Sequence, residues 1–167
     1  MKLASLFSTG AVLQRDHFIP IWGECSPNAV VRAELAGREA FAPASASGRF
    51  MLRLPPLQAG GPYDLRVTDL TTRQSIAVPD VLIGEVWLAS GQSNMAYGLF
   101  RADETAITGK PSQYEDFVAG LEDPSTLRML AVPTCYSGAP EDGVRAEWQT
   151  ATPENVRKFS AVALWFA

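Results

Sequence analysis

One serine in this chain has a sequence context in which a hydroxyl could act as a nucleophile. Ser93 follows Val81–Ala89, a mostly apolar run without regular alternation, which is typical of a strand covered on both faces in a parallel sheet. Ligands of open α/β sheets gather where such strands end and backbone N–H groups of the next helix point outward. Each such donor is worth roughly 2.7 to 4 kcal/mol to an oxyanion formed by attack on an ester. The segment therefore predicts an exposed serine suited to ester hydrolysis.

A simpler interpretation of the same serine is structural. Position 95 is Met95, so the segment lacks the Gly-x-Ser-x-Gly elbow of many hydrolases. Ser and Asn are favoured helix caps, so Ser93 or Asn94 is expected to cap a helix over Ser93–Leu99. Gly91 is expected to let the backbone turn tightly before the serine. From these residues alone, both interpretations stay open.

A serine hydroxyl needs a general base within hydrogen-bond reach, and the chain offers few candidates. His17, the only histidine, lies in the N-terminal region and resembles no base motif, so a surface or turn position is expected for it. The acidic pairs Asp103-Glu104 and Glu115-Asp116 have no partner at a readable spacing and predict solvated faces, not metal or glycosidase chemistry. We expect neither a metal nor a cofactor.

Composition excludes some classes of function. The 167 residues are 47% hydrophobic and 19% charged with a net charge of -4, which predicts a folded, soluble protein without the basic footprint of nucleic-acid binding. No apolar stretch approaches the roughly 20 residues of a membrane span. Met1–Ser8 lacks a signal-peptide core, so the chain either stays inside the cell or has lost a leader. Cys25 and Cys135 are expected to be buried free thiols.

Two regions differ in pattern. Residues 1–79 alternate short apolar stretches with turn formers, which predicts an antiparallel β-sandwich domain. Its candidate strands are Phe18–Gly23, Ala29–Leu35, Arg49–Leu54, Tyr63–Thr68 and Ser75–Val78.

Residues 80–167 predict the beginning of an α/β domain, with a boundary at Pro79-Asp80. After the Val81–Ala89 strand come the expected helix at Ser93, a helical piece at Tyr114–Leu121, a strand at Thr126–Val132, a helical turn at Pro153 and a helix Ala161–Ala167 capped by Ser160. Because this last helix has no closing signal, the domain is predicted to be incomplete. The tryptophans lie in apolar segments and are expected to pack rather than form sugar platforms; they are Trp22, Trp87, Trp148 and Trp165.

Val81–Met95 resembles the nucleophile block of the sialate O-acetylesterase family, a branch of the SGNH hydrolases. Further landmarks of that family match in order: Ala11–Arg15, Ile21-Trp22-Gly23, Gly60–Tyr63 and Phe159–Val162. The resemblance implies a jelly-roll-like β-sandwich followed by an SGNH-type α/β domain that removes acetyl groups from sugar hydroxyls such as those of sialic acid. It implies that Ser93 is the nucleophile and, through its own N–H, an oxyanion donor, with Gln92 and Asn94 in supporting roles. Ala89 and Tyr97 depart from the usual pattern of the block.

In this family the Asp-x-x-His pair and the remaining oxyanion donors come from later blocks, and this sequence ends before them. The chain is therefore expected to be inactive alone. Three hypotheses follow. The chain is an esterase fragment; or it is a non-catalytic carbohydrate-binding or scaffolding module; or it is one chain of a two-chain enzyme whose second polypeptide carries Asp and His. An acetylated sugar is the expected substrate, with no nucleic acid and no membrane as partner.

Overall fold

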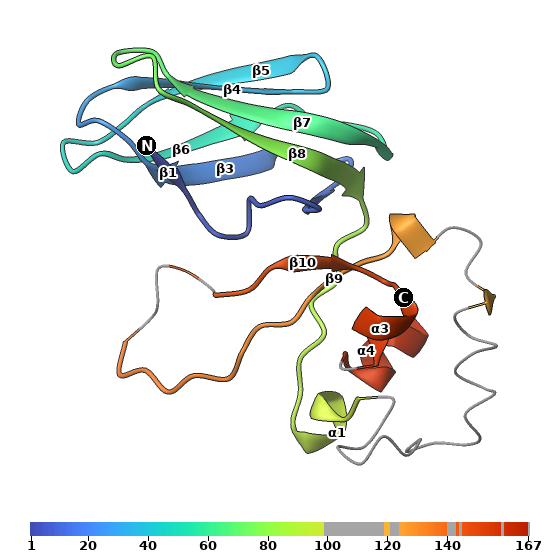
Figure 1. Ribbon diagram of the computed structural model, residues 1–167. Coiled ribbons are helices and arrows are strands. Elements are labelled where there is room, and N and C mark those ends of the chain that lie inside the picture. Colours follow the sequence, from blue (N-terminus) through green and yellow to red (C-terminus); the bar gives the residue numbers. More distant parts are fainter. Residues whose placement is uncertain (99–118, 121–123, 140–142, 144, 158, 167) are drawn as a thin grey trace. The chain divides into compact units, whose positions relative to one another are not determined.

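The computed structural model describes residues 1–98, 119–120, 124–139, 143, 145–157 and 159–166 (Figure 1). The chain divides into two units. One comprises Met1–Val86 with Val132–Trp148, and the other comprises Trp87–Ala131 with Gln149–Ala167. The acidic pairs and most of the helical piece predicted at Tyr114–Leu121 lie outside the described residues.

The first unit is formed by strands arranged in two sheets (Figure 1). Its strands are β1 (Lys2–Leu3), β2 (Val12–Gln14), β3 (Ile19–Glu24), β4 (Val30–Leu35), β5 (Arg38–Pro43), β6 (Arg49–Leu54), β7 (Gly60–Asp69) and β8 (Ser75–Gly84). One sheet has the order β1-β3-β6 and the other β2-β8-β7-β4-β5. Neighbours are antiparallel except β2 and β8, which are parallel. The strands predicted for this region are present as β3, β4, β6, β7 and β8, and this part of the chain is β-rich as expected.

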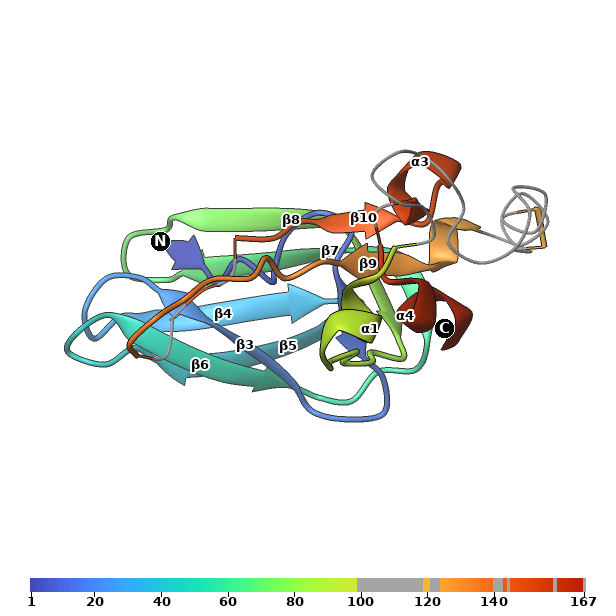
Figure 2. The same ribbon diagram turned by 90° about the horizontal axis from the view of Figure 1, so that it is seen from below.

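Figure 2 shows the strands of both sheets from below. Alternate side chains of the two sheets meet in one hydrophobic core. Along β4 the residues Val31, Ala33 and Leu35 are buried and those between them are not. β6 alternates in the same way and buries Leu52 and Leu54. Burying a Val or Leu side chain contributes about 1.5 to 3 kcal/mol relative to leaving it exposed, so this alternation is what holds the sheets together.

β5 was not predicted from the sequence. Leu35 and Arg38 are paired across a two-residue loop, Ala36-Gly37, and both loop residues have positive φ, at 48° and 74°. Two-residue hairpin loops need this conformation, and Asn-Gly or Asp-Gly usually provides it. The alanine in this loop hid the hairpin.

The prediction of one buried parallel strand over Val81–Ala89 is wrong in its extent and in part of its pairing. Only Val81 to Gly84 is in a strand, as the end of β8, where it pairs in parallel with β2 and antiparallel with β7. Val81 and Ile83 are buried while the residues between and after them are half-buried. β8 runs through Pro79 and Asp80 because pairing shifts from Leu65–Val78 to Tyr63–Val81. Two residues of β8 thus oppose one of β7, a bulge that accommodates a proline without an N–H.

The second unit contains short elements. They are α1 (Ser93–Ala96), a 3-10 turn η1 (Pro124–Thr126), β9 (Arg128–Leu130), α3 (Pro153–Val156) and α4 (Ala161–Phe166). β9 is the neighbour of β10 (Trp148–Thr150) in a two-stranded sheet. The core of this unit consists of Met129, Ala151, Val156 and Leu164. In the part of the chain that the structure describes, no helix has the length and apolar character needed to cross a membrane.

Two helix starts predicted in this unit, at Pro153 and at Ser160, are confirmed. Pro153 is in the first turn of α3, and the Thr152 hydroxyl accepts a hydrogen bond from the Asn155 N–H at 3.3 Å. Ser160 caps α4 in the same way, because its hydroxyl accepts from the Ala163 N–H at 3.3 Å. Such caps satisfy N–H groups that have no partner within the helix.

Candidate functional site

Ser93 is the first residue of α1, and it is exposed. The residues from Glu85 to Gly91 form neither strand nor helix and connect β8 to this short helix (Figure 1). Within the described ranges, no hydrogen bond occupies the Ser93 hydroxyl. The side chain is therefore presented to solvent and is not committed to a structural contact.

The expectation that Ser93 or Asn94 caps this helix is wrong. Gln92 is the N-cap, and it makes no side-chain cap hydrogen bond. Its carbonyl accepts from the N–H groups of Met95 at 3.0 Å and Ala96 at 3.3 Å. Ser93 is thus already inside the first turn, where backbone N–H groups have no acceptor within the helix. The simpler explanation for the serine, a capping role, does not apply.

Gly91 has a different role from the expected one. It is not in the left-handed region of φ, so no special turn requires it. A Cβ at this position would lie 3.2 Å from the Cβ of Met95. Glycine therefore allows the chain before Ser93 to pass close to the side of α1.

Residues at the start of α4 hold the segment around Ser93. The Ala161 N–H donates to the Tyr97 carbonyl at 2.9 Å, and Gly98 forms an isolated β-bridge with Ser160. The Ser160 hydroxyl donates to the Met95 sulfur at 3.2 Å. Two landmarks of the resemblance, the Ser93 block and Phe159–Val162, thus meet in one place.

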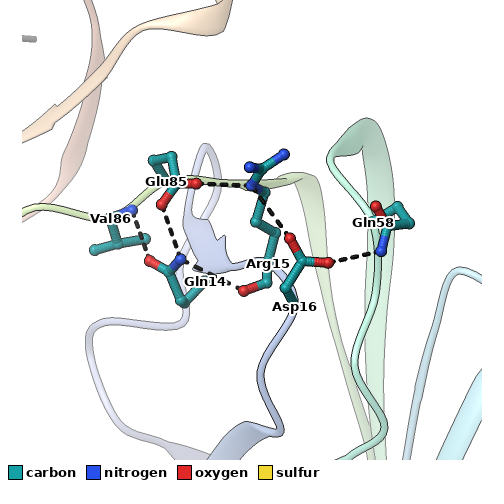
Figure 3. A network of polar contacts seen from close by, with 6 residues as sticks. All are labelled: Gln14, Arg15, Asp16, Gln58, Glu85 and Val86. Atoms are coloured by element: carbon teal, nitrogen blue, oxygen red, sulfur yellow. Dashed lines mark hydrogen bonds and ion pairs between the residues drawn. The ribbon is translucent and has the colours of Figure 1, made fainter.

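The polar network in Figure 3 joins one further landmark, Ala11–Arg15, to the Val81–Met95 block at the end of β8, in the first unit. The Glu85 carboxylate accepts from Arg15 Nε at 2.7 Å and from Gln14 Nε2 at 3.0 Å. The side-chain oxygen Oε1 of Gln14 accepts from the Val86 N–H at 2.9 Å. The Gln14 side chain therefore bonds both to the Glu85 side chain and to the backbone of the next residue after β8.

Asp16 extends this network. It lies 3.4 Å from Arg15 Nε and accepts from Gln58 Nε2 at 2.6 Å. The hydrogen bond from Gln14, with that from Arg15, holds the pKa of Glu85 below its usual value, and Glu85 raises the pKa of Arg15. Sequence reasoning assigned no role to these residues, because partners so far apart along the chain leave no local signal.

His17 is exposed in the turn between β2 and β3, so the expectation of a surface or turn histidine is confirmed. Both cysteines are free. Cys25 is half-buried, and burial raises the pKa of its thiol. Cys135 is exposed, so the prediction that it is buried is wrong.

The tryptophans divide into two kinds. Trp22 packs edge-on against Phe7 at 4.7 Å between ring centroids, and Trp148 Nε1 donates to the Leu6 carbonyl. Trp87 and Trp165 are 66% and 59% exposed, so the packing expected of them is only partial. Among the described residues, no group of three or more His, Cys, Asp or Glu side chains converges on a point that could hold a metal.

A shallow hollow of about 380 Å³ lies over β4, β5 and β7. Three of its charged side chains pair with one another: Arg32 contacts Glu34 at 2.8 Å and Glu39 at 2.7 Å. The Arg32 guanidinium also lies 5.9 Å from the centroid of the Phe41 ring. With the guanidinium already paired, the hollow offers less to a ligand than the exposed hydroxyl of Ser93.

Comparisons with known proteins agree with the landmarks. No family model matches the chain. Human sialate O-acetylesterase is 34% identical over 98% of this chain and 33% of its own length, and the Pongo abelii protein of that name is 29% identical over the same shares. The mouse sialate O-acetylesterase is 35% identical over 56% of the chain and 19% of its length. A crystal structure of a carbohydrate acetylesterase from Xanthomonas citri aligns with a TM-score of 0.83 and 39% identity, over 99% of this chain and 36% of that one.

The β-rich fold and these alignments define the class as proteins related to carbohydrate esterases. More particularly, the chain belongs to the sialate O-acetylesterase family. It spans about a third of the length of the human and Pongo abelii relatives.

Proposed function

We propose that this chain supplies the nucleophile of a serine esterase that removes O-acetyl groups from carbohydrates, and that Ser93 is that nucleophile. One observation carries the proposal. Ser93 is exposed at the start of α1 with a hydroxyl that bonds to no other described residue, in a chain whose relatives are named as acetylesterases.

In the proposed reaction, Ser93 Oγ attacks the carbonyl carbon of the acetyl ester and loses its proton to a base. The carbonyl oxygen becomes an oxyanion, to which the Ser93 N–H donates. Its collapse breaks the bond to the sugar oxygen, which takes the proton from the base and leaves as a hydroxyl, and an acetyl-serine remains. Water then attacks that ester and releases acetate. Gln92 and Asn94 flank the nucleophile and shape its turn.

The base comes from other polypeptide. His17 is the only histidine of the chain, and it lies in the turn after β2. We propose that an SGNH-type α/β domain, begun within residues 80–167, is completed by polypeptide that carries the Asp-His pair. The β-sandwich of residues 1–79 accompanies this domain.

The test uses a chimaera in which this chain replaces the segment that it matches in the Xanthomonas citri carbohydrate acetylesterase. We expect acetate release from an O-acetylated sugar and labelling of Ser93 by a serine-directed phosphonate. Ser93→Ala should lower turnover by roughly 10⁴-fold or more. Ser90→Ala is the matched control, because Ser90 is also exposed and lies three residues away, and it should leave turnover unchanged.

Labelling that persisted in Ser93→Ala would show that another residue is the nucleophile. Sugar binding that survived Ser93→Ala, with no acetate released by the unsubstituted chimaera, would favour the non-catalytic carbohydrate-binding module instead.

A further inference from the structure

α4 is apolar on every side. Its residues are Ala161, Val162, Ala163, Leu164, Trp165 and Phe166. Helices of this kind are buried on all sides in folded proteins. In this unit only one side is buried: Ala163 is 9% and Leu164 2% exposed, and Leu164 belongs to the core of the unit.

The other side of α4 lies open. Val162, Trp165 and Phe166 stand three and four residues apart, so they share one face of the helix, and they are 51%, 59% and 63% exposed. The Phe166 ring meets Trp87 edge-on at 5.1 Å between centroids, and Leu88 next to it is 90% exposed.

This open face continues to the candidate nucleophile. Ala161 of α4 bonds to Tyr97, which is 56% exposed and follows α1, and Ser93 begins that helix. We call the exposed side chains together the α4 face; they are Trp87, Leu88, Tyr97, Val162, Trp165 and Phe166. Neither 87–98 nor 161–166 contains a charged residue, so no charged side chain of these segments offsets the cost of exposing the apolar face to water. Soluble monomers rarely leave such contiguous apolar surface open.

The lengths of the relatives indicate what covers this face. The match occupies 33% of human sialate O-acetylesterase and 36% of the Xanthomonas citri acetylesterase. About two thirds of each relative therefore lies outside it.

We propose that the α4 face is the docking surface for polypeptide equivalent to that unmatched two thirds. Resting on the proposed function, this docking brings the base to the helix that carries Ser93. The occupant has an apolar surface of its own and, once docked, turns α4 into an inner element of a larger domain.

The first experiment measures access to position 88. Leu88→Cys is introduced into a Cys25→Ser, Cys135→Ser background, both in the chain alone and in the chimaera. Maleimide should react quickly in the chain alone and about tenfold or more slowly in the chimaera, because alkylation requires solvent access. Phe18→Cys is the matched control: Phe18 is 64% exposed and lies in the first unit, so it should react at the same rate in both.

Equal reactivity of Cys at position 88 in the chain alone and in a cooperatively folding chimaera would overturn the proposal. Slow reaction in the chain alone would overturn it too, because residues of this chain would then already cover the face. Ser93→Ala in the chimaera should abolish acetate release and leave the protection intact. Protection of position 88 in an unsubstituted chimaera that releases no acetate would refute the proposed function and not the docking surface.

A second measurement needs no chimaera. The chain alone should self-associate through its open apolar face, as followed by sedimentation over a range of concentrations. Leu88→Asp should shift it toward monomer, whereas Phe18→Asp should not. A chain that stays monomeric throughout, or that responds equally to both substitutions, would contradict the proposal.

Discussion

Arg15 Nε donates to Glu85 Oε1 at 2.7 Å across 70 residues of sequence. Arg15 follows β2 and Glu85 follows β8, and these two strands run parallel side by side. Parallel neighbours bring their carboxyl ends to the same edge of a sheet. The contact therefore joins the residue after β2 to the residue after β8, at the start of the segment that leads to Ser93.

Glu85→Ala should make the chain after β8 more mobile without unfolding the first unit. The substitution removes the acceptor of both Arg15 and Gln14. Because exposed ion pairs contribute little to global stability, the urea midpoint should stay nearly unchanged, whereas protease cleavage between residues 85 and 92 should become faster. Glu39→Ala, which removes an ion pair to Arg32 elsewhere on the surface, should leave that cleavage rate unchanged. A large fall in the midpoint would mean that Glu85 supports the core instead.

Asp69 makes the stability of the first unit sensitive to acid. Its side chain is fully buried and accepts from the N–H groups of Thr72 at 3.0 Å, Ser26 at 3.2 Å and Thr71 at 2.9 Å. These bonds, led by that from Thr72, hold the pKa of Asp69 far below its usual value.

The folded-state pKa of Asp69 is lowered, so the stabilisation is complete above the unfolded-state pKa of about 3.9 and is lost as pH falls toward the folded one. Asp69→Asn should therefore lower the urea midpoint at pH 7 and flatten its decline below about pH 4. Asp64→Asn, an exposed position on the same strand, is the control and should change neither. An unchanged slope in Asp69→Asn would show that other carboxylates cause the acid sensitivity.

Alternation was sufficient to predict much of the first unit. Val31, Ala33 and Leu35 point to the core at every second position, and the turn formers Ser26-Pro27-Asn28 come before β4. The path of β8 could not be read in this way. Leu82 is apolar although it is only half-buried between Val81 and Ile83, so the end of the strand shows no alternation in the sequence. The bulge at Pro79 depends on pairing with β7.

The candidate site shows the same division. A short motif marked Ser93 as a candidate, but its predicted position directly after a strand differs from the structure, in which β8 ends at Gly84 and Ser93 begins α1. The bond between Ser160 and Met95 spans 65 residues, and that between Arg15 and Glu85 spans 70. Contacts of this kind depend on how distant segments fold together, and neither residue type nor local spacing encodes them.

Gly91→Ala should disturb the approach to Ser93. The added Cβ would lie 3.2 Å from Met95 Cβ, an atom fixed to the backbone of α1, so the chain has to shift. Small displacements at a reacting group are costly, and acetate release by the chimaera should fall by about tenfold. Gly138→Ala is the matched control, because a Cβ there would meet nothing within 4 Å. Full activity in Gly91→Ala would mean that the segment tolerates the shift.

Ser160→Ala separates support of Ser93 from ordinary helix capping. The Ser160 hydroxyl accepts from the Ala163 N–H and donates to the Met95 sulfur, so one substitution removes the cap of α4 and a tie to α1. Loss of the cap should cost about 0.5 to 2 kcal/mol in urea unfolding. Thr152→Ala removes the cap of α3 and should cost a similar amount. Only Ser160→Ala should also slow phosphonate labelling of Ser93 in the chimaera, because α1 then loses its contact with α4. If both variants slowed labelling equally, Ser160 would act on the serine through stability alone.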